Sequence, residues 1–204
     1  GTSGSSLSFG VKENNYLGEG IKLGSNLSVS EESLTGSLFY NEPNYKNSNR
    51  SLNRGIERVE DDRLSSFGYK TEKTGFTIGT GYEQYKDIFF TPSISNYYES
   101  ITTNSLASAS KKKQEGNYFD LLLDYDVVLN KLNQNFNPTD GYKFTFTQEV
   151  PLYTEDYSLV NKINYSKYLQ TDNGTILSFG IFTAAANSIS NDDVRVTKRI
   201  FIPS

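Results

Sequence analysis

The sequence predicts an all-β fold: a single, partial antiparallel transmembrane β-barrel domain over residues 1–204, with about ten strands. The chain is polar, with 35% hydrophobic residues and a mean hydropathy of −0.56. No window approaches the ~20 consecutive apolar residues of a membrane-spanning helix. A barrel strand exposes only every second residue to lipid, so its average hydropathy stays polar. The 15 Tyr and 13 Phe suit a bilayer interface.

The clearest predicted strand covers residues 118–130. One set of alternate positions is almost wholly apolar, and the other carries three aspartates. A helix, with 3.6 residues per turn, would scatter this pattern over both faces. The segment is also longer than the ~5–6 residues of an ordinary strand and reaches the ~9–11 needed to cross a bilayer. The apolar positions are Phe119, Leu121, Leu123, Tyr125, Val127 and Leu129.

The same alternation predicts further strands before and after this one. Clear period-two segments cover residues 7–12, 21–29, 76–83 and 142–150, and a segment blurred at both ends covers 176–182. Weaker alternation predicts strands at 34–41, 51–57, 64–71 and 157–169. No segment has the periodicity of a helix, and the total is about ten strands.

The predicted connections fall into two alternating sets. One set is rich in Asn, Asp, Gly and Pro, which tolerate turn conformations: 14–20, 41–49, 70–75, 133–141 and 170–174. The other set comprises 30–33, 59–62, 85–117, 151–156 and a tail after residue 187. Segment 85–117 is predicted to be a long extracellular loop, because outer-membrane barrels have short turns at one end and longer loops at the other.

The residues that commonly carry catalysis or bind metals are scarce. The chain has no His and no Cys, which removes imidazole and thiolate chemistry. Asp120, Asp124 and Asp126 share one strand face and imitate a carboxylate site. Strand alternation alone explains their spacing, so we interpret them as a hydrated lumen wall that faces Lys or Arg across the barrel. No catalytic, cofactor-binding or metal-binding residue is predicted, and the chain is not expected to be an enzyme.

Other charged groups are interpreted as solvated loops. Asp61–Asp62 and 191–193 offer calcium-type ligands without the spacing of an EF-hand. Lys111, Lys112 and Lys113 lie in the predicted long loop, where contact with anionic lipid is the alternative to simple hydration. The net charge of −4 argues against nucleic acid as a partner.

The chain lacks Met, and its polar first residues do not resemble a signal peptide. We therefore expect an internal piece of a larger protein. Two unpaired edge strands and an apolar outer face predict that this piece aggregates when expressed alone in water.

Three turn motifs, in order, resemble the barrel of the BamA family of outer-membrane protein assembly factors, within the wider superfamily of barrel-assembly and two-partner-secretion proteins. The first is a strand and an Asn-aromatic-Leu-Gly-x-Gly turn at 4–20, GSSLSFGVKENNYLGEG. The second is a polar turn before Pro at 38–45, LFYNEPNY. The third is a Pro-Thr-Asp-Gly turn at 135–144, NFNPTDGYKF. The resemblance covers nearly the whole chain.

The resemblance implies about the second to eleventh strands of a larger barrel of about sixteen strands. It makes 15–20 and 138–141 periplasmic turns, and 198–204, KRIFIPS, the approach to a lumenal loop. It implies a place in the bacterial outer membrane and a role in folding and inserting β-barrel proteins. The implied partners are unfolded outer-membrane proteins, other subunits of the assembly machinery and outer-membrane lipid, without a cofactor.

Two other functions remain open on the residues alone. A polar lumen also suits a two-partner-secretion or porin-type pore. A soluble or surface-displayed β-sandwich binding module would instead have shorter strands and an apolar face shared by two sheets.

Overall fold

The computed structural model describes residues 5–155 and 157–189, which form one antiparallel sheet of ten strands in chain order. Two short helices interrupt the connections, η1 (Tyr45–Asn47) and α1 (Ala109–Lys112). Neither has the length or apolar character to cross a bilayer. The strands are β1 (Ser6–Tyr16), β2 (Ile21–Ser30), β3 (Ser33–Glu42), β4 (Ser51–Arg63), β5 (Tyr69–Tyr85), β6 (Ile88–Thr103), β7 (Gly116–Asn130), β8 (Gly141–Tyr153), β9 (Ser158–Gln170) and β10 (Ile176–Ser188).

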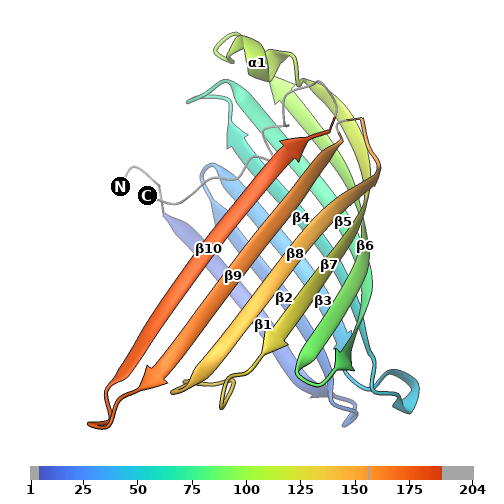
Figure 1. The fold of residues 1–204 in the computed structure, drawn as a ribbon. Coiled ribbons are helices and arrows are strands. Elements are labelled where there is room, and N and C mark those ends of the chain that lie inside the picture. Colours follow the sequence, from blue (N-terminus) through green and yellow to red (C-terminus); the bar gives the residue numbers. More distant parts are fainter. Residues whose placement is uncertain (1–4, 156, 190–204) are drawn as a thin grey trace.

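The sheet curls around an interior but does not close. β1 to β5 form one side of the wall, β6 turns the corner, and β7 to β10 form the other side (Figure 1). Each strand pairs with its neighbours in the chain, and β1 and β10 stand at the two edges. The prediction of a partial antiparallel β-barrel is confirmed. A β-sandwich, which needs two packed sheets, is excluded by the single ten-stranded sheet.

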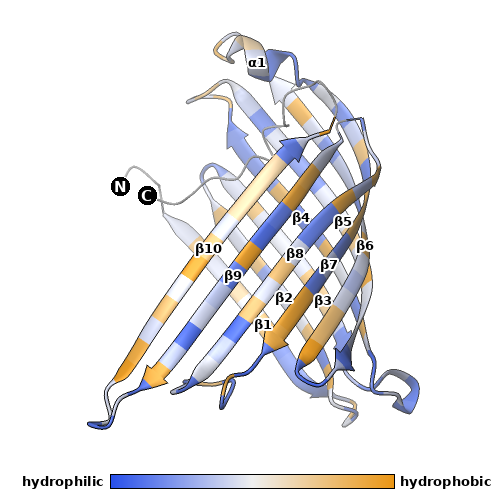
Figure 2. Cartoon of the chain, viewed as in Figure 1, coloured by the Kyte–Doolittle hydropathy of each residue, from blue (hydrophilic) through white to orange (hydrophobic). Residues whose placement is uncertain are grey.

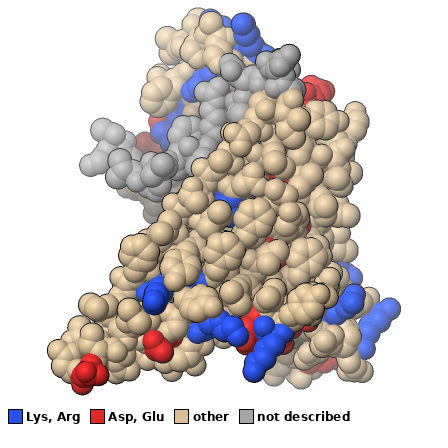
Figure 3. Space-filling view, viewed as in Figure 1, with Lys and Arg blue, Asp and Glu red and all other residues tan. Residues whose placement is uncertain are grey.

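The outer face of the wall is apolar and exposed. One row of hydrogen-bonded neighbours runs across it through Val11, Ser25, Leu38, Ile56 and Phe76. Figure 2 shows the resulting bands of apolar and polar residues along each strand. Over the strands nearest the viewer, the middle of the wall is mostly free of charged side chains, which gather near the turns at the lower end (Figure 3). Such a surface is unfavourable in water and suits an apolar surrounding.

The packed core lies on the inner face, near the end of the sheet that carries α1. Ile101, Leu122 and Val160 are buried there. They lie beside buried polar side chains, among which Glu99 and Asp120 are each only 2% exposed. The inner face therefore combines a small apolar cluster with a larger polar surface.

The prediction of a long loop at 85–117 is wrong. Residues 88–103 form β6, and only 104–115 connect it to β7. The turns predicted at 59–62 and 70–75 are also wrong, because they lie inside β4 and β5, and the true turn is at 64–68. The segments 64–71 and 76–83, predicted as two strands, overlap the single 17-residue β5. The expected number of strands is correct because one extra strand offsets one missed strand.

The strand at 88–103 was not predicted because its alternation of apolar and polar residues is irregular. Phe89–Phe90 and Tyr97–Tyr98 place an aromatic ring on both faces, and Pro92 is the fifth residue of the strand. Proline has no N–H for the ladder and normally argues against a central strand. The pairing of β5 with β6 is interrupted at this point, between the Gly79–Ser93 pair and the Tyr82–Phe90 pair. Pro92 is accommodated by that interruption.

Two aromatic rings on the inner face lie over glycines of the adjacent strand. A Cβ added to Gly24 would lie 1.9 Å from a ring carbon of Phe39, and one added to Gly75 would lie 2.3 Å from a ring carbon of Tyr97. Both glycines are therefore needed because they leave space for a ring, and not because the backbone adopts an unusual conformation there. The Lys73 ammonium also makes a cation–π contact with the Tyr97 ring, 3.8 Å from its centroid.

Candidate functional site

The aspartates of β7 lie on the inner face, as the sequence predicts, and Asp124 is the end of a hydrogen-bonded chain that runs through Ser95 to Thr77. The Ser95 hydroxyl donates to the Asp124 carboxylate at 2.6 Å, and the Ser95 and Thr77 hydroxyl oxygens are 3.0 Å apart. The chain joins β5, β6 and β7. It gives a carboxylate in the wall the polar partners it needs away from bulk water.

The other two aspartates accept hydrogen bonds in the same way. Thr147 donates to Asp126, and Thr154 donates to the buried Asp120. Asp124, Asp126 and Lys162 also line one cavity of about 150 Å³ on this face. The expected partners were cations across the barrel. The hydrogen bonds come from hydroxyls on neighbouring strands, because hydrogen-bonded neighbours lie within side-chain reach, and one cation, Lys162, lines the same cavity as Asp124 and Asp126.

The sequence missed these hydroxyl partners for two different reasons. Ser95 lies in the segment predicted as a loop, so its face was not assigned. Thr154 lies between β8 and β9, and only the folded turn brings it to Asp120. A signal for Ser95 did exist, since Thr91, Ser93 and Ser95 share alternate positions in the chain.

No cluster of three or more potential metal ligands occurs among residues 5–155 and 157–189. Asp61 accepts from Arg63 Nε at 2.9 Å, and Asp62 accepts from the Leu64 backbone N–H at 3.1 Å. The hydrogen bonds of these two aspartates therefore belong to the end of the wall where the chain passes from β4 to β5. The candidate at 191–193 lies outside the described residues.

The lysine run lies at the opposite end from the short turns, in and after α1. The Lys111 ammonium is 3.3 Å from the centroid of the Tyr69 ring and 5.6 Å from that of Phe67. The Lys112 ammonium donates to the Ser105 carbonyl at 3.2 Å. Two of the three lysines thus hold the connection between β6 and β7 against the first residues of β5. These two lysines therefore have a structural role and are not simply hydrated.

The predicted turn at 15–20 connects β1 and β2. Leu17, Gly18 and Gly20 all have positive φ, at 58°, 74° and 71°. The Asn15 side-chain oxygen accepts from the Gly20 N–H at 2.7 Å, and the Asn15 carbonyl accepts from the Gly18 N–H at 3.0 Å. The Asn-aromatic-Leu-Gly-x-Gly pattern therefore corresponds to a real local structure, in which Asn15 closes the turn and glycine permits it.

The turn that contains 138–141 connects β7 and β8 and is closed by another asparagine. The Asn133 side-chain oxygen accepts from the Thr139 and Asp140 N–H groups, each at 3.2 Å. Gly141 has φ of 98°, and a Cβ there would lie 2.1 Å from the Lys131 carbonyl oxygen. Both motif turns lie at the same end of the sheet, opposite α1 (Figure 1).

Neighbouring turns at this end are also joined to each other. The Lys131 ammonium pairs with the Asp87 carboxylate, which links the β7–β8 turn to the β5–β6 turn. This hydrogen bond raises the pKa of Lys131 above its usual value. Both groups are substantially exposed, so the pair fixes the relative position of the turns more than it stabilises the fold.

The two edges of the sheet are the remaining feature. Within residues 5–155 and 157–189, β1 pairs only with β2, and β10 pairs only with β9. Every residue of β1 is exposed, and so are most of β10. An open edge presents unpaired N–H and C=O groups, which are a template for another strand and are costly in lipid.

A curled antiparallel wall with an apolar outer face, a polar inner face and two open edges defines a class: part of a membrane β-barrel. The comparison with protein families shows which family of membrane β-barrels this chain belongs to. The model of the Omp85 superfamily domain matches residues 15–202, and the chain belongs to that superfamily.

The chain is also similar to a solved barrel of this kind, the crystal structure of BamA from Haemophilus ducreyi lacking POTRA domains 1–3. The TM-score is 0.76 at 22% sequence identity, and the match covers 94% of this chain. The matched region is 40% of the Haemophilus ducreyi chain, so this chain spans less than half of that protein's length. At this identity the likeness concerns the fold, and it supports the expected BamA-like barrel.

Proposed function

We propose that this chain is part of the wall of a bacterial outer-membrane β-barrel that folds and inserts other β-barrel proteins. The observation that carries the proposal is the match of the Omp85 superfamily domain over residues 15–202, on a ten-strand wall that fits a BamA barrel. Unfolded outer-membrane proteins are the proposed clients, and other subunits of an assembly machinery are the proposed partners. The role needs no catalytic group and is not enzymatic.

The physical basis is pairing at a strand edge. A strand entering the membrane must satisfy its backbone groups, because each unsatisfied group costs several kcal/mol in hydrocarbon. A barrel with an imperfectly closed seam supplies such pairing. In this proposal the described strands are the stable part of the barrel, and their short turns, including 15–20 and 138–141, face the periplasm.

The test is depletion of the complete protein that carries this chain, followed by quantitative proteomics of the outer membrane. The proposal predicts that many unrelated β-barrel proteins decrease together. Re-expression of the protein should restore them.

A secretion or solute pore is the alternative, since a polar inner face around Asp124 and Asp126 suits either role. It predicts loss of one flux or one secreted protein while other barrels keep their abundance. That outcome would contradict the assembly proposal.

A further inference from the structure

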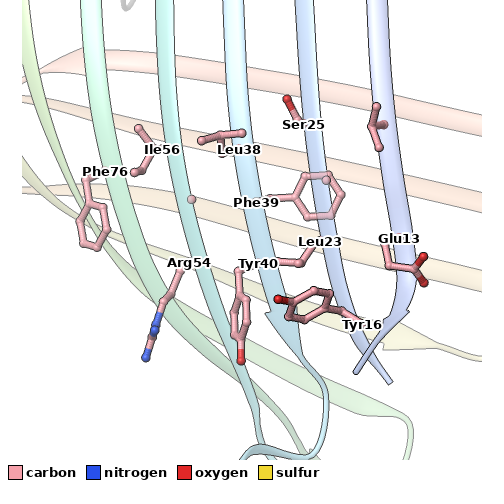
Figure 4. Close-up of a pocket in the computed structure, with 13 residues that line it drawn as sticks. Glu13, Tyr16, Leu23, Ser25, Leu38, Phe39, Tyr40, Arg54, Ile56 and Phe76 are labelled. Carbon is pink, nitrogen blue, oxygen red and sulfur yellow. The ribbon is translucent and has the colours of Figure 1, made fainter. Parts of the chain in front are cut away.

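The outer face carries a depression that the proposed assembly role does not use. It has a volume of about 610 Å³ and extends from β1 to β5 (Figure 4). This volume is within the ~300–1,000 Å³ range of small-molecule sites. Its walls are the outward side chains of the apolar row and of the row below it: Val11, Leu23, Leu38, Tyr40, Arg54, Ile56 and Phe76.

The hollow exists because small residues interrupt the apolar surface. Ser25 lies between Val11 and Leu38 in its row, and Gly36 lies beside Leu27 in the row above. A second depression of about 340 Å³ shares Ser25, Leu38 and Ile56 with the first. The two depressions therefore form one groove along the outer face, with Arg54 toward one end and Arg58 toward the other.

The two arginines differ in their partners. Arg58 is neutralised: its Nη2 is 2.7 Å from Glu72 Oε1 and 3.8 Å from Glu60 Oε2. Arg54 has no carboxylate within 4.0 Å among the described residues. Its guanidinium is 5.5 Å from the centroid of the Tyr40 ring. At this end of the groove the Arg54 guanidinium is therefore in no ion pair, although the Glu42 carboxylate lies nearby and accepts from the Tyr40 hydroxyl at 2.7 Å.

Arg54 also lies at the end of the groove nearer the short turns. In Figure 4, Arg54, Tyr40 and Tyr16 lie nearer the ends of their strands, and Ile56 and Leu38 lie farther along the wall. An arginine that only reaches toward water would explain its position. That explanation does not account for an apolar hollow of ligand size that begins beside it.

We propose that this groove binds an anionic phospholipid, with an acyl chain in the apolar hollow and the phosphate on Arg54. The arginine fork suits phosphate, and a charge-assisted pair is strong at a surface with little water. Glu13, the acidic residue of the lining, stands on β1, three strands away from Arg54 in the same row, and Glu42 is bonded to the Tyr40 hydroxyl, so the Arg54 fork is in no ion pair and can bind the phosphate.

The experiment uses the complete protein in detergent micelles that contain phosphatidylglycerol or phosphatidylcholine, with native mass spectrometry to count retained lipids. The wild-type protein should retain phosphatidylglycerol in preference to phosphatidylcholine. Arg54→Gln should lower phosphatidylglycerol retention by about tenfold, as expected for the loss of a charge-assisted pair. The matched control Arg58→Gln, on the same strand and face, should change it by less than about twofold.

A second variant tests the hollow without touching the charge. Ser25→Phe fills the depression, and an extra ring is compatible with a lipid-facing position. It should also abolish selective retention, while the heat-dependent shift of the band on an SDS gel shows that the barrel is folded.

Three results would overturn the proposal. One is an equal effect of Arg54→Gln and Arg58→Gln. Another is retention of lipopolysaccharide in place of phosphatidylglycerol. The third is a dimer whose formation is abolished by Ser25→Phe, since a second copy would then be the occupant. None of these results bears on the assembly role, which is tested by depletion.

Discussion

The inner face of the sheet is polar and the outer face is apolar, which is the reverse of a water-soluble protein. On the inner face Ser95, Glu99 and Asp120 are each 2% exposed. On the outer face Leu7 is 75% exposed and Phe179 is 58% exposed. Successive residues of a strand point to opposite faces, so the polar interior and the apolar exterior come from the same segments. The contrast shows that the medium outside the wall is apolar, and that the cost of burying polar groups is met by hydrogen bonds between strands.

A charge in the middle of the outer face should give the largest effect. Leu123→Arg places a guanidinium next to Ile94 and Val150 on the outer face. The expected loss is about 2–4 kcal/mol in the free energy of unfolding, the range for arginine at the bilayer midplane. Equilibrium denaturation of the complete protein in lipid vesicles would measure it.

The control for this substitution is Val128→Arg, on the inner face of the same strand. It should cost less than half as much, because the added charge reaches the polar interior. Equal losses for the two variants would mean that the faces do not see different media, and the membrane assignment would be lost.

The close packing of the inner face should give the second largest effect. Gly24→Ala places a methyl group against the Phe39 ring, where the added Cβ would be 1.9 Å from a ring carbon. Overpacking of this kind costs about 1–3 kcal/mol. Thermal or urea unfolding should show this loss, and Phe39→Ala in the same chain should reverse the clash.

Gly36→Ala is the matched change on the outer face of the adjoining strand. The added methyl there would be 3.9 Å from a Leu27 methyl, an ordinary contact. Its effect should be close to zero. If both alanines were harmless, the packing of rings over glycines would not distinguish the inner face.

The sequence predicts the faces better than it predicts the strand ends. Residues 118–130 lie within β7, and their apolar and acidic positions point outward and inward as expected. This success has a physical cause, since alternation directly encodes which residues meet an apolar medium. The turns with strong local chemistry were also predictable, as Asn15 and Gly20 show.

The failures occur where alternation is weak. β5 and β6 have 17 and 16 residues, longer than the bilayer requires, and the upper part of β5 carries charged side chains on the outer face. Lys70 and Glu72 on β5 pair with the β4 residues Glu60 and Arg58. Such a segment reads as a turn in the sequence, because polarity on both faces removes the period-two signal. The groove at Ser25 and Arg54 could not be predicted from the sequence either, because it depends on which strands are neighbours.

The smallest expected effect concerns two serines on the inner face of β6. Ser95 is 2% exposed and its hydroxyl bonds to Asp124 at 2.6 Å and to Thr77 at 3.0 Å, whereas Ser93, one position along the same face, has no side-chain hydrogen bond among the described residues. Ser95→Ala should therefore cost about 1–2 kcal/mol, because it leaves a carboxylate in the wall with one donor fewer.

Ser93→Ala removes the same hydroxyl two residues away and should cost less than about 0.5 kcal/mol. The two variants are compared by urea unfolding in the same lipid. If Ser93→Ala costs as much as Ser95→Ala, the loss reflects removal of any hydroxyl from a hydrated wall. A difference of about 1 kcal/mol or more would mean that the inner face depends on specific cross-strand bonds, since only those distinguish the two positions.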